Sequence, residues 1–184
     1  MSAQATVAPA RFPDVFILPS GATLVLRAVE RTDRDRIHEL FDRLGEESRY
    51  RRFLTPKREL SERELADLSE IDHVRHEAIA AVDQRDGSFA GLVRVVARSD
   101  RPAADMAIEV ADELQHMGIG SCLTARILER AGEIGFATLT ATTLRHNPPA
   151  RALLKRFGFS PAASAGHEIE LERELCFAGE SLAA

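Results

Sequence analysis

A turn with two glycines joins a strand-like segment to a strongly amphipathic helical segment at residues 110–121, which read Val110-Ala111-Asp112-Glu113-Leu114-Gln115-His116-Met117-Gly118-Ile119-Gly120-Ser121. Glycines two residues apart can take up positive φ angles and let a ligand approach the backbone closely. The first amides of the helix that follows have no acceptor within the helix, so they point at one spot and attract an anion. The segment therefore predicts a phosphate-binding turn between a strand and a helix.

Two common phosphate-binding motifs are excluded at this turn. Position 123 is Leu where a dinucleotide fingerprint has its third glycine, and the Gly-Lys-Ser/Thr of a P-loop does not follow. On spacing alone, a glycine-rich connection that binds no ligand is the alternative.

The segments around the turn alternate between period 2 and period 3.6, as expected of a mixed α/β domain. We expect strands at residues 22–29, 77–83, 89–97, 104–111, 136–144 and 167–175. We expect five helices: from Thr32 or Asp33 to Gly45, over residues 48–54, from the capping box Ser61-Glu62-Arg63-Glu64 onward, over residues 118–134, and from Pro148 to Phe157.

The order of these elements indicates the topology of the sheet. The pair Asp86-Gly87 predicts a hairpin between the second and third strands, and an antiparallel meander occupies the middle of the chain. The second half forms a β-α-β crossover unit. Charged and apolar residues alternate over residues 167–175, which predicts a strand at the edge of the sheet.

Length and composition limit the classes of protein that fit. The 184 residues suit one domain over residues 15–176, with residues 1–14 and 177–184 as flexible ends. A net charge of −5 argues against nucleic acid as the principal partner, and no apolar run approaches the roughly 18 residues of a membrane helix. Cys122 and Cys176 form no metal-binding pattern, so we expect reduced thiols, no metal and a cytoplasmic location.

Two blocks of this sequence resemble the GNAT superfamily of acetyltransferases. Gln115-x-x-Gly118-x-Gly120 resembles the family signature Q/R-x-x-G-x-G/A, and residues 147–159 (NPPARALLKRFGF) resemble the N-x-x-A-x-x-L…G-F helix. The stretch from Leu44 to Pro56, with Leu60, Ser61, Asp72 and residues 76–78, is similar to the GNAT domain of bacterial protein-lysine acetyltransferases that modify acyl-CoA synthetases. The resemblance covers about residues 22–159 and implies a mixed, mostly antiparallel sheet of six to seven strands flanked by helices.

The same resemblance implies a site for acetyl-CoA. In the family, the backbone of the turn binds the pyrophosphate, the preceding strand pairs with the pantetheine arm, and an asparagine bonds the cofactor. The cofactor-binding residues it implies are Ile108, Val110, Gln115, His116, Met117, Gly118, Ile119, Gly120, Ser121 and Asn147. This chain departs from the family at two positions: Met117 replaces a usual basic residue, and Leu154 replaces the tyrosine that serves many members as an acid.

Direct transfer to an amine needs a base, because a lysine with a pKa of about 10.4 is protonated at pH 7 at a cost of roughly 4.6 kcal/mol. Period-2 alternation places Asp105 and Glu109 on one face of the predicted strand 104–111. Asp105 also lies ten residues before Gln115, where the lysine-acetylating subfamily has a catalytic glutamate. We expect Asp105 as the base and Glu109 as the reserve, the alternative being that either is a solvated residue or an ion-pair partner.

The resemblance thus implies an enzyme that transfers acetyl from acetyl-CoA to a primary amine, with a protein lysine, such as one on an acyl-CoA synthetase, favoured as acceptor. A small-molecule amine is the rival acceptor. A degenerate acyl-CoA-binding regulatory module is the rival function, because of Leu154 and the shorter Asp105. The sequence makes no prediction of the oligomeric state. A basic cluster of Arg49, Arg51, Arg52, Lys57 and Arg58 either steers an acidic protein substrate, orders a lid over the amine site, or is a solvated face.

Overall fold

The computed structural model of the chain describes residues 14–99 and 102–175. The ends predicted to be flexible, apart from Asp14, lie outside the described residues, as does Cys176. No helix within the described residues is both long enough and apolar enough to cross a bilayer.

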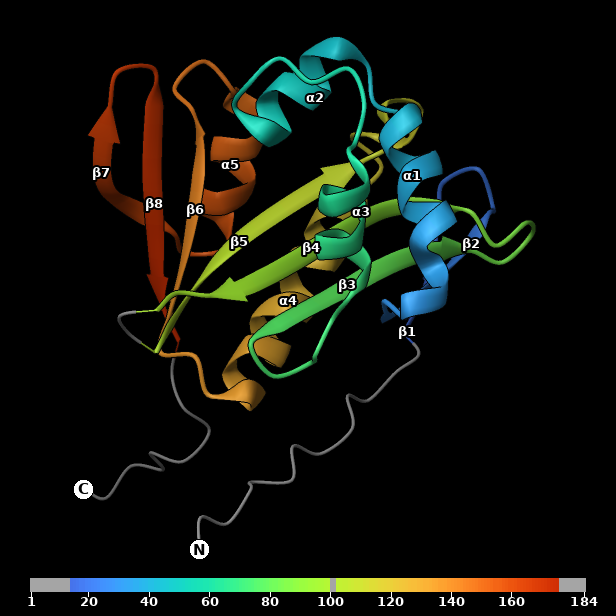
Figure 1. Cartoon of the computed structure of the whole chain (residues 1–184), viewed down its shortest axis with the longest axis horizontal. Helices are drawn as coiled ribbons and strands as arrows, with labels where there is room; N and C mark the ends of the chain where they lie inside the picture. The colour runs from blue at the N-terminus through green and yellow to red at the C-terminus, as the bar shows by residue number, and fades with distance from the viewer. Residues whose placement is uncertain (1–13, 100–101, 176–184) are drawn as a thin grey trace, which may run out of the picture.

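An eight-stranded sheet in the order β1-β2-β3-β4-β5-β6-β8-β7 forms the centre of the fold (Figure 1). Neighbouring strands are antiparallel except β5 and β6, which are parallel. The strands are β1 (Asp14–Ile17), β2 (Thr23–Ala28), β3 (His76–Asp83), β4 (Phe89–Ala97), β5 (Ala103–Val110), β6 (Thr138–Leu144), β7 (Ser160–Ala165) and β8 (Glu168–Glu174). The predicted fold class, a mixed and mostly antiparallel sheet flanked by helices, is confirmed.

Two strands, β1 and β7, were not predicted, and one prediction about the sheet is wrong. Residues 167–175 do not form an edge strand, because β8 lies between β6 and β7. The sequence of β7, SPAASA, has no β-branched or aromatic residue, and all six of its residues are exposed. Its strand conformation therefore comes from pairing with β8 across a turn at Gly166, where φ is +53°, and intrinsic propensity gives no signal for it.

Five α-helices match the five predicted. They are α1 (Arg34–Asp42), α2 (Glu46–Phe53), α3 (Glu62–Ser69), α4 (Ile119–Ile134) and α5 (Pro148–Arg156), with short 3₁₀ turns η1 (Arg31–Asp33) and η2 (Asp112–Leu114) before α1 and α4. The predicted capping box at α3 is present, since the Ser61 hydroxyl accepts a hydrogen bond from the Glu64 amide and the Glu64 carboxylate accepts one from the Ser61 amide.

The helices cover the sheet in two layers. Helix α4 buries Leu123, Ile127 and Ala131 against strands β2 to β5, and α5 packs on the same side of β6 and β8. Helices α1 and α3 cover the other face of the sheet. Each fully buried aliphatic side chain contributes about 1.5–3 kcal/mol, so α4 is held firmly against the strands that flank the turn before it.

Strands β5 and β6 pair over three positions only, Ala103 with Thr138, Ala104 with Leu139 and Asp105 with Thr140. Beyond these positions β5 continues beside β4 and β6 continues beside β8, so the two strands separate (Figure 1). The edge of β5 from Met106 to Val110 consequently has no strand partner on the β6 side. The sheet opens there, directly before the turn that leads into α4.

The close approach of β4, β5 and α4 at Gly91 gives a test of this packing. A Cβ at Gly91 would lie 2.9 Å from the carbonyl oxygen of Glu109 and 3.1 Å from Cδ1 of Leu123. Gly91→Ala should therefore lower the free energy of unfolding by about 1–3 kcal/mol, because the end of β5 has to move. Gly132 in α4 is the matched control, since nothing lies within 4 Å of its added Cβ. Gly132→Ala should raise that free energy by about 0.4–1 kcal/mol. Urea unfolding measures both, and equal effects would contradict the described packing.

Candidate active site

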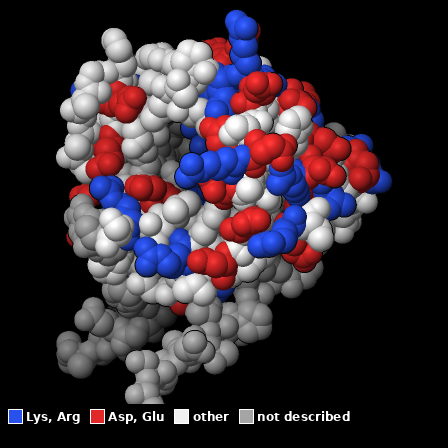
Figure 2. Space-filling view, in the orientation of Figure 1, with Lys and Arg blue, Asp and Glu red and all other residues white. Residues whose placement is uncertain are grey.

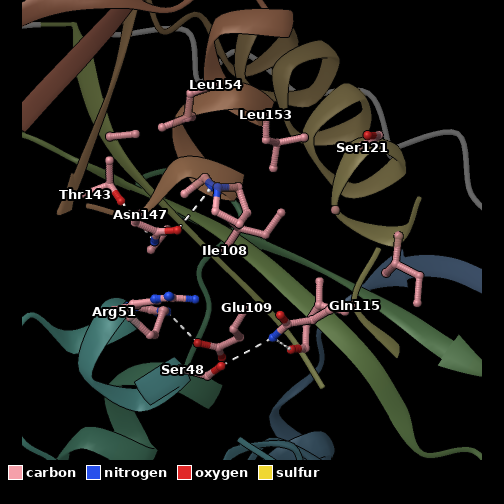
Figure 3. Close-up of a pocket in the computed structure, with 18 of the residues that line it drawn as sticks. Ser48, Arg51, Ile108, Glu109, Gln115, Ser121, Thr143, Asn147, Leu153 and Leu154 are labelled. Carbon is pink, nitrogen blue, oxygen red and sulfur yellow. Dashed lines mark hydrogen bonds and ion pairs between the residues drawn. The ribbon is translucent and has the colours of Figure 1, made fainter. Parts of the chain in front are cut away.

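A cavity of about 420 Å³ lies between the separated ends of β5 and β6. Its lining includes residues from both faces of β5, such as Ile108 and Glu109, so the cavity passes through the opening in the sheet. Figure 3 shows that α5 contributes Leu153 and Leu154 on one side and α2 contributes Ser48 and Arg51 on the other. The turn before α4 closes one end of the cavity.

The turn before α4 has the backbone conformation that the glycines predict. Gly118 has a φ of +89° and His116 a φ of +63°, both in the left-handed region. No side chain caps α4, and the amides of Ser121 and Cys122 donate to the Gly118 carbonyl. Within the described part of the chain, the amides of Ile119 and Gly120 have no acceptor. Together with the positive end of the α4 dipole, these amides can bind an anionic group.

Side-chain hydrogen bonds fix the turn before α4 and the start of α5. The amide nitrogen of Gln115 donates to the Val110 carbonyl at 3.2 Å and to Asp112 Oδ1 at 3.0 Å, which holds the turn against the end of β5. Asn147, 7% exposed, accepts a hydrogen bond from the Ala150 amide at 3.3 Å and so caps α5. Both side chains line the cavity, but these bonds also give each of them a role in positioning the backbone.

Glu109 and Arg52 form a buried ion pair in the wall of the cavity. Arg52 Nε lies 2.5 Å from Glu109 Oε2, and the two side chains are only 9% and 7% exposed. The contact lacks the alignment of a hydrogen bond, so both atoms are buried without one. A carboxylate in the wall of a cavity can accept a proton from a group bound there.

Most of the site residues predicted from the sequence line this one cavity. The cavity lining contains Ile108, Glu109, Val110, Gln115, His116, Gly118, Ile119, Gly120, Ser121 and Asn147. Asp105 is not part of the lining: its side chain is 64% exposed, bonds the Thr140 hydroxyl and lies 3.4 Å from Arg98. Met117 packs against the hydrophobic core beneath α4 and is not part of the lining either.

Three arginines near Glu109 were not predicted as site residues. Arg51 and Arg52 line the cavity from α2, whereas the sequence indicated only a basic cluster of undecided role. Arg94 of β4 lies opposite Ala107, on the same face of the sheet as Glu109. Burial, together with repulsion by Arg52, lowers the pKa of the Arg94 guanidinium to about 10. The environment of Glu109 is therefore rich in positive charge.

The remaining residues of the basic cluster serve local structure. Arg49 donates to the carbonyl oxygens of Phe41, Asp42 and Arg58, which joins α2 to α1 and to the loop before α3. Lys57 pairs with Glu64 at 2.5 Å. The cluster thus divides between cavity-lining residues and residues that hold α2 in place.

Comparison with known proteins places this fold and cavity in one family. Residues 35–159, more than half of the chain, match the acetyltransferase (GNAT) family. An acetyltransferase of Pseudomonas aeruginosa is 27% identical over 144 residues, which cover 77% of this chain and 77% of that protein. The crystal structure of the GNAT domain of PAT from S. lividans has a TM-score of 0.83 and 25% identity, covering 91% of this chain and 99% of that one.

A more distant structure shares the fold. The GNAT superfamily phosphinothricin acetyltransferase of Sinorhizobium meliloti, solved in complex with acetyl-CoA, has a TM-score of 0.67 and 22% identity, covering 88% of this chain and 93% of that one. The family match, the curated relative and the fold around the split strands agree. The chain belongs to the acetyltransferase (GNAT) family and is an acetyl-CoA-dependent acetyltransferase.

Proposed function

We propose that this acetyltransferase transfers the acetyl group directly to a primary amine, and that the amine is the side chain of a protein lysine. One observation carries the proposal: the carboxylate of Glu109 is buried in the cavity wall, on the part of β5 that no longer pairs with β6. An amine that enters the cavity therefore meets a proton acceptor beside the open edge of β5.

The cavity residues fit acetyl-CoA, which supplies the activated acetyl thioester when bound. The amides of Ile119 and Gly120 can hold its diphosphate, because they lack other acceptors within the described residues. The open edge of β5, with the backbone of Ile108 and Val110, offers hydrogen bonds to the amides of a pantetheine arm.

Two effects can supply the neutral amine that the reaction needs. Burial disfavours the ammonium form, and the guanidinium groups of Arg51 and Arg52 in the cavity wall disfavour it further. Glu109 then accepts the proton as a carboxylate of the cavity wall, where its Oε2 is paired with Arg52 Nε at 2.5 Å. We propose Glu109 as the base in place of Asp105, whose exposed carboxylate is held by Thr140 and Arg98 outside the cavity lining.

The departing thiolate needs no dedicated acid. The position where many family members have a tyrosine is Leu154, which is 4% exposed. A thiol with a pKa near 8.5 is a good leaving group as its thiolate. We therefore propose that catalysis in this chain depends on the base and on positioning.

The similarity of residues 44–56 to protein-lysine acetyltransferases supports a protein acceptor. This segment contains α2, and α2 supplies Ser48, Arg51 and Arg52 to the cavity. Release of free CoA thiol in the presence of lysine-containing peptides, with mass spectrometry of the peptide, tests the reaction. Turnover with small amines but with no lysine peptide would favour the small-molecule reading, and binding of acetyl-CoA without any turnover would favour a regulatory module.

The role of Glu109 is tested against that of Asp105 by two isosteric amides. Glu109→Gln should lower kcat by about 10²–10⁴-fold, the usual contribution of a general base. Asp105→Asn should stay within about threefold, because that carboxylate lies outside the cavity lining. Calorimetry should give unchanged acetyl-CoA affinity for both variants. The reverse ranking of the two kcat values would assign the base to Asp105.

The phosphate-binding turn is tested by two Gly→Ala substitutions. Gly118→Ala puts a side chain at a φ of +89° and 3.3 Å from Phe16, which should cost about 1–2 kcal/mol and weaken CoA binding about fivefold to thirtyfold. Gly120→Ala meets only ordinary contacts, with Leu153 at 3.5 Å and Ile108 at 3.8 Å, and its φ is not in the left-handed region. Its CoA affinity should change less than threefold. Isothermal titration with CoA gives both values, and an unaffected Gly118→Ala would count against the turn.

A further inference from the structure

A row of four glutamates runs along one face of β8. Glu168, Glu170, Glu172 and Glu174 alternate with Ile169, Leu171 and Arg173, so they share a face and lie about 7 Å apart. The apolar residues between them point the other way, into the core under α5. The four glutamates, called the acidic row below, therefore occupy the face of β8 that α5 does not cover.

The neighbouring strands do not neutralise the acidic row. The residues opposite it on β6 are Leu144, Thr142, Thr140 and Thr138, and those opposite it on β7 are Ala165, Ala163 and Ser160. Among the described residues, Arg98 is the only cation that contacts the row, at 3.5 Å from Glu170, and it also contacts Asp105. Other parts of the described surface pair their charges, for example Arg126 with Glu129 and Arg43 with Glu113. The row keeps an excess of negative charge at some cost in repulsion.

The acidic row leads to the cavity. Glu170 lies opposite Thr142, which lines the cavity, and Glu172 lies opposite Thr140, which pairs with Asp105. Figure 2 shows carboxylates at the left of the molecule, with some basic side chains beside the lower ones, and a hollow between them and further basic side chains on its other side.

The cavity at the end of this path contains a further carboxylate, that of Glu109. The Glu109 carboxylate is 7% exposed, lines the cavity and is paired with Arg52 at 2.5 Å. Glu109 lies on the same face of the sheet as the acidic row. Glu109 shares a face of β5 with Asp105, Asp105 pairs with Thr140 of β6, and Thr140 pairs with Glu172 of the row. A path of carboxylates thus ends at a buried carboxylate inside the cavity.

We propose that the acidic row is the docking surface for the acceptor protein and that it binds a cationic stretch beside the lysine to be acetylated. The inference rests on the proposed function and names the acceptor's chemistry: an extended, arginine- or lysine-rich segment. The row spans six residue steps of a strand, about 20 Å, which an extended segment of about six residues matches. Complementary charge steers such a segment and fixes its register, while the lysine enters the cavity.

Two matched peptides test the proposal. Each is blocked at its N-terminus and contains one lysine; one has two arginines within the six residues that follow the lysine, and the other has serines there. The native enzyme should acetylate the arginine peptide with a kcat/KM at least fivefold higher, and 0.5 M salt should remove most of that preference, because surface charges are then screened. The double variant Glu170→Gln/Glu172→Gln should lose the preference and keep its rate with the serine peptide.

The control variant Asp35→Asn/Glu39→Gln makes the same change in net charge on exposed positions of α1, at the other end of the sheet (Figure 1). It should retain the preference. Equal rates with both peptides, or equal losses in both variants, would overturn the docking surface while leaving amine acetylation intact. Faster turnover of spermidine than of the arginine peptide would overturn the protein acceptor. Failure of every amine would instead point to the proposed function itself.

Discussion

The parallel pairing of β5 with β6 ends after three residue pairs, and the chemistry of the cavity depends on that separation. In a continuous sheet, the backbone groups of Met106 to Val110 that face away from β4 would bond the next strand, and no ligand could reach them. Because β6 turns to pair with β8 while β5 stays beside β4, these groups are left for another partner. The same separation brings the turn before α4 to one end of the opening and Glu109 to its wall.

Charge is distributed unevenly about this opening. Arg51 and Arg52 line the cavity and Arg94 lies on the same sheet face as Glu109, an arrangement that favours anions and disfavours an ammonium ion. The uncovered face of β8 carries glutamates with few cationic neighbours. In our account the acidic face attracts a cationic acceptor, and the cationic interior then favours its neutral amine, so the two regions act at successive stages.

Local signals in the sequence predicted much of the fold, but not the contacts that complete the site. The capping box at Ser61, the Asp86-Gly87 hairpin and the glycines before α4 each specify a conformation within a few residues, and each is present. The pairing of Arg52 with Glu109 joins residues far apart in the chain, and no local pattern encodes it. Alternation predicted that Asp105 and Glu109 share a face, yet only Glu109 lines the cavity, because the strands part between those two positions.

The central claim is that the edge of β5 and the start of α4 together receive coenzyme A. Amide chemical shifts of the isotopically labelled protein, recorded by NMR as CoA is added, test it residue by residue. The account predicts the largest changes at Ile108, Val110, Ile119 and Gly120, with small changes on β2. Saturable binding with the largest changes on strands far from the gap, or with none at these four amides, would contradict it.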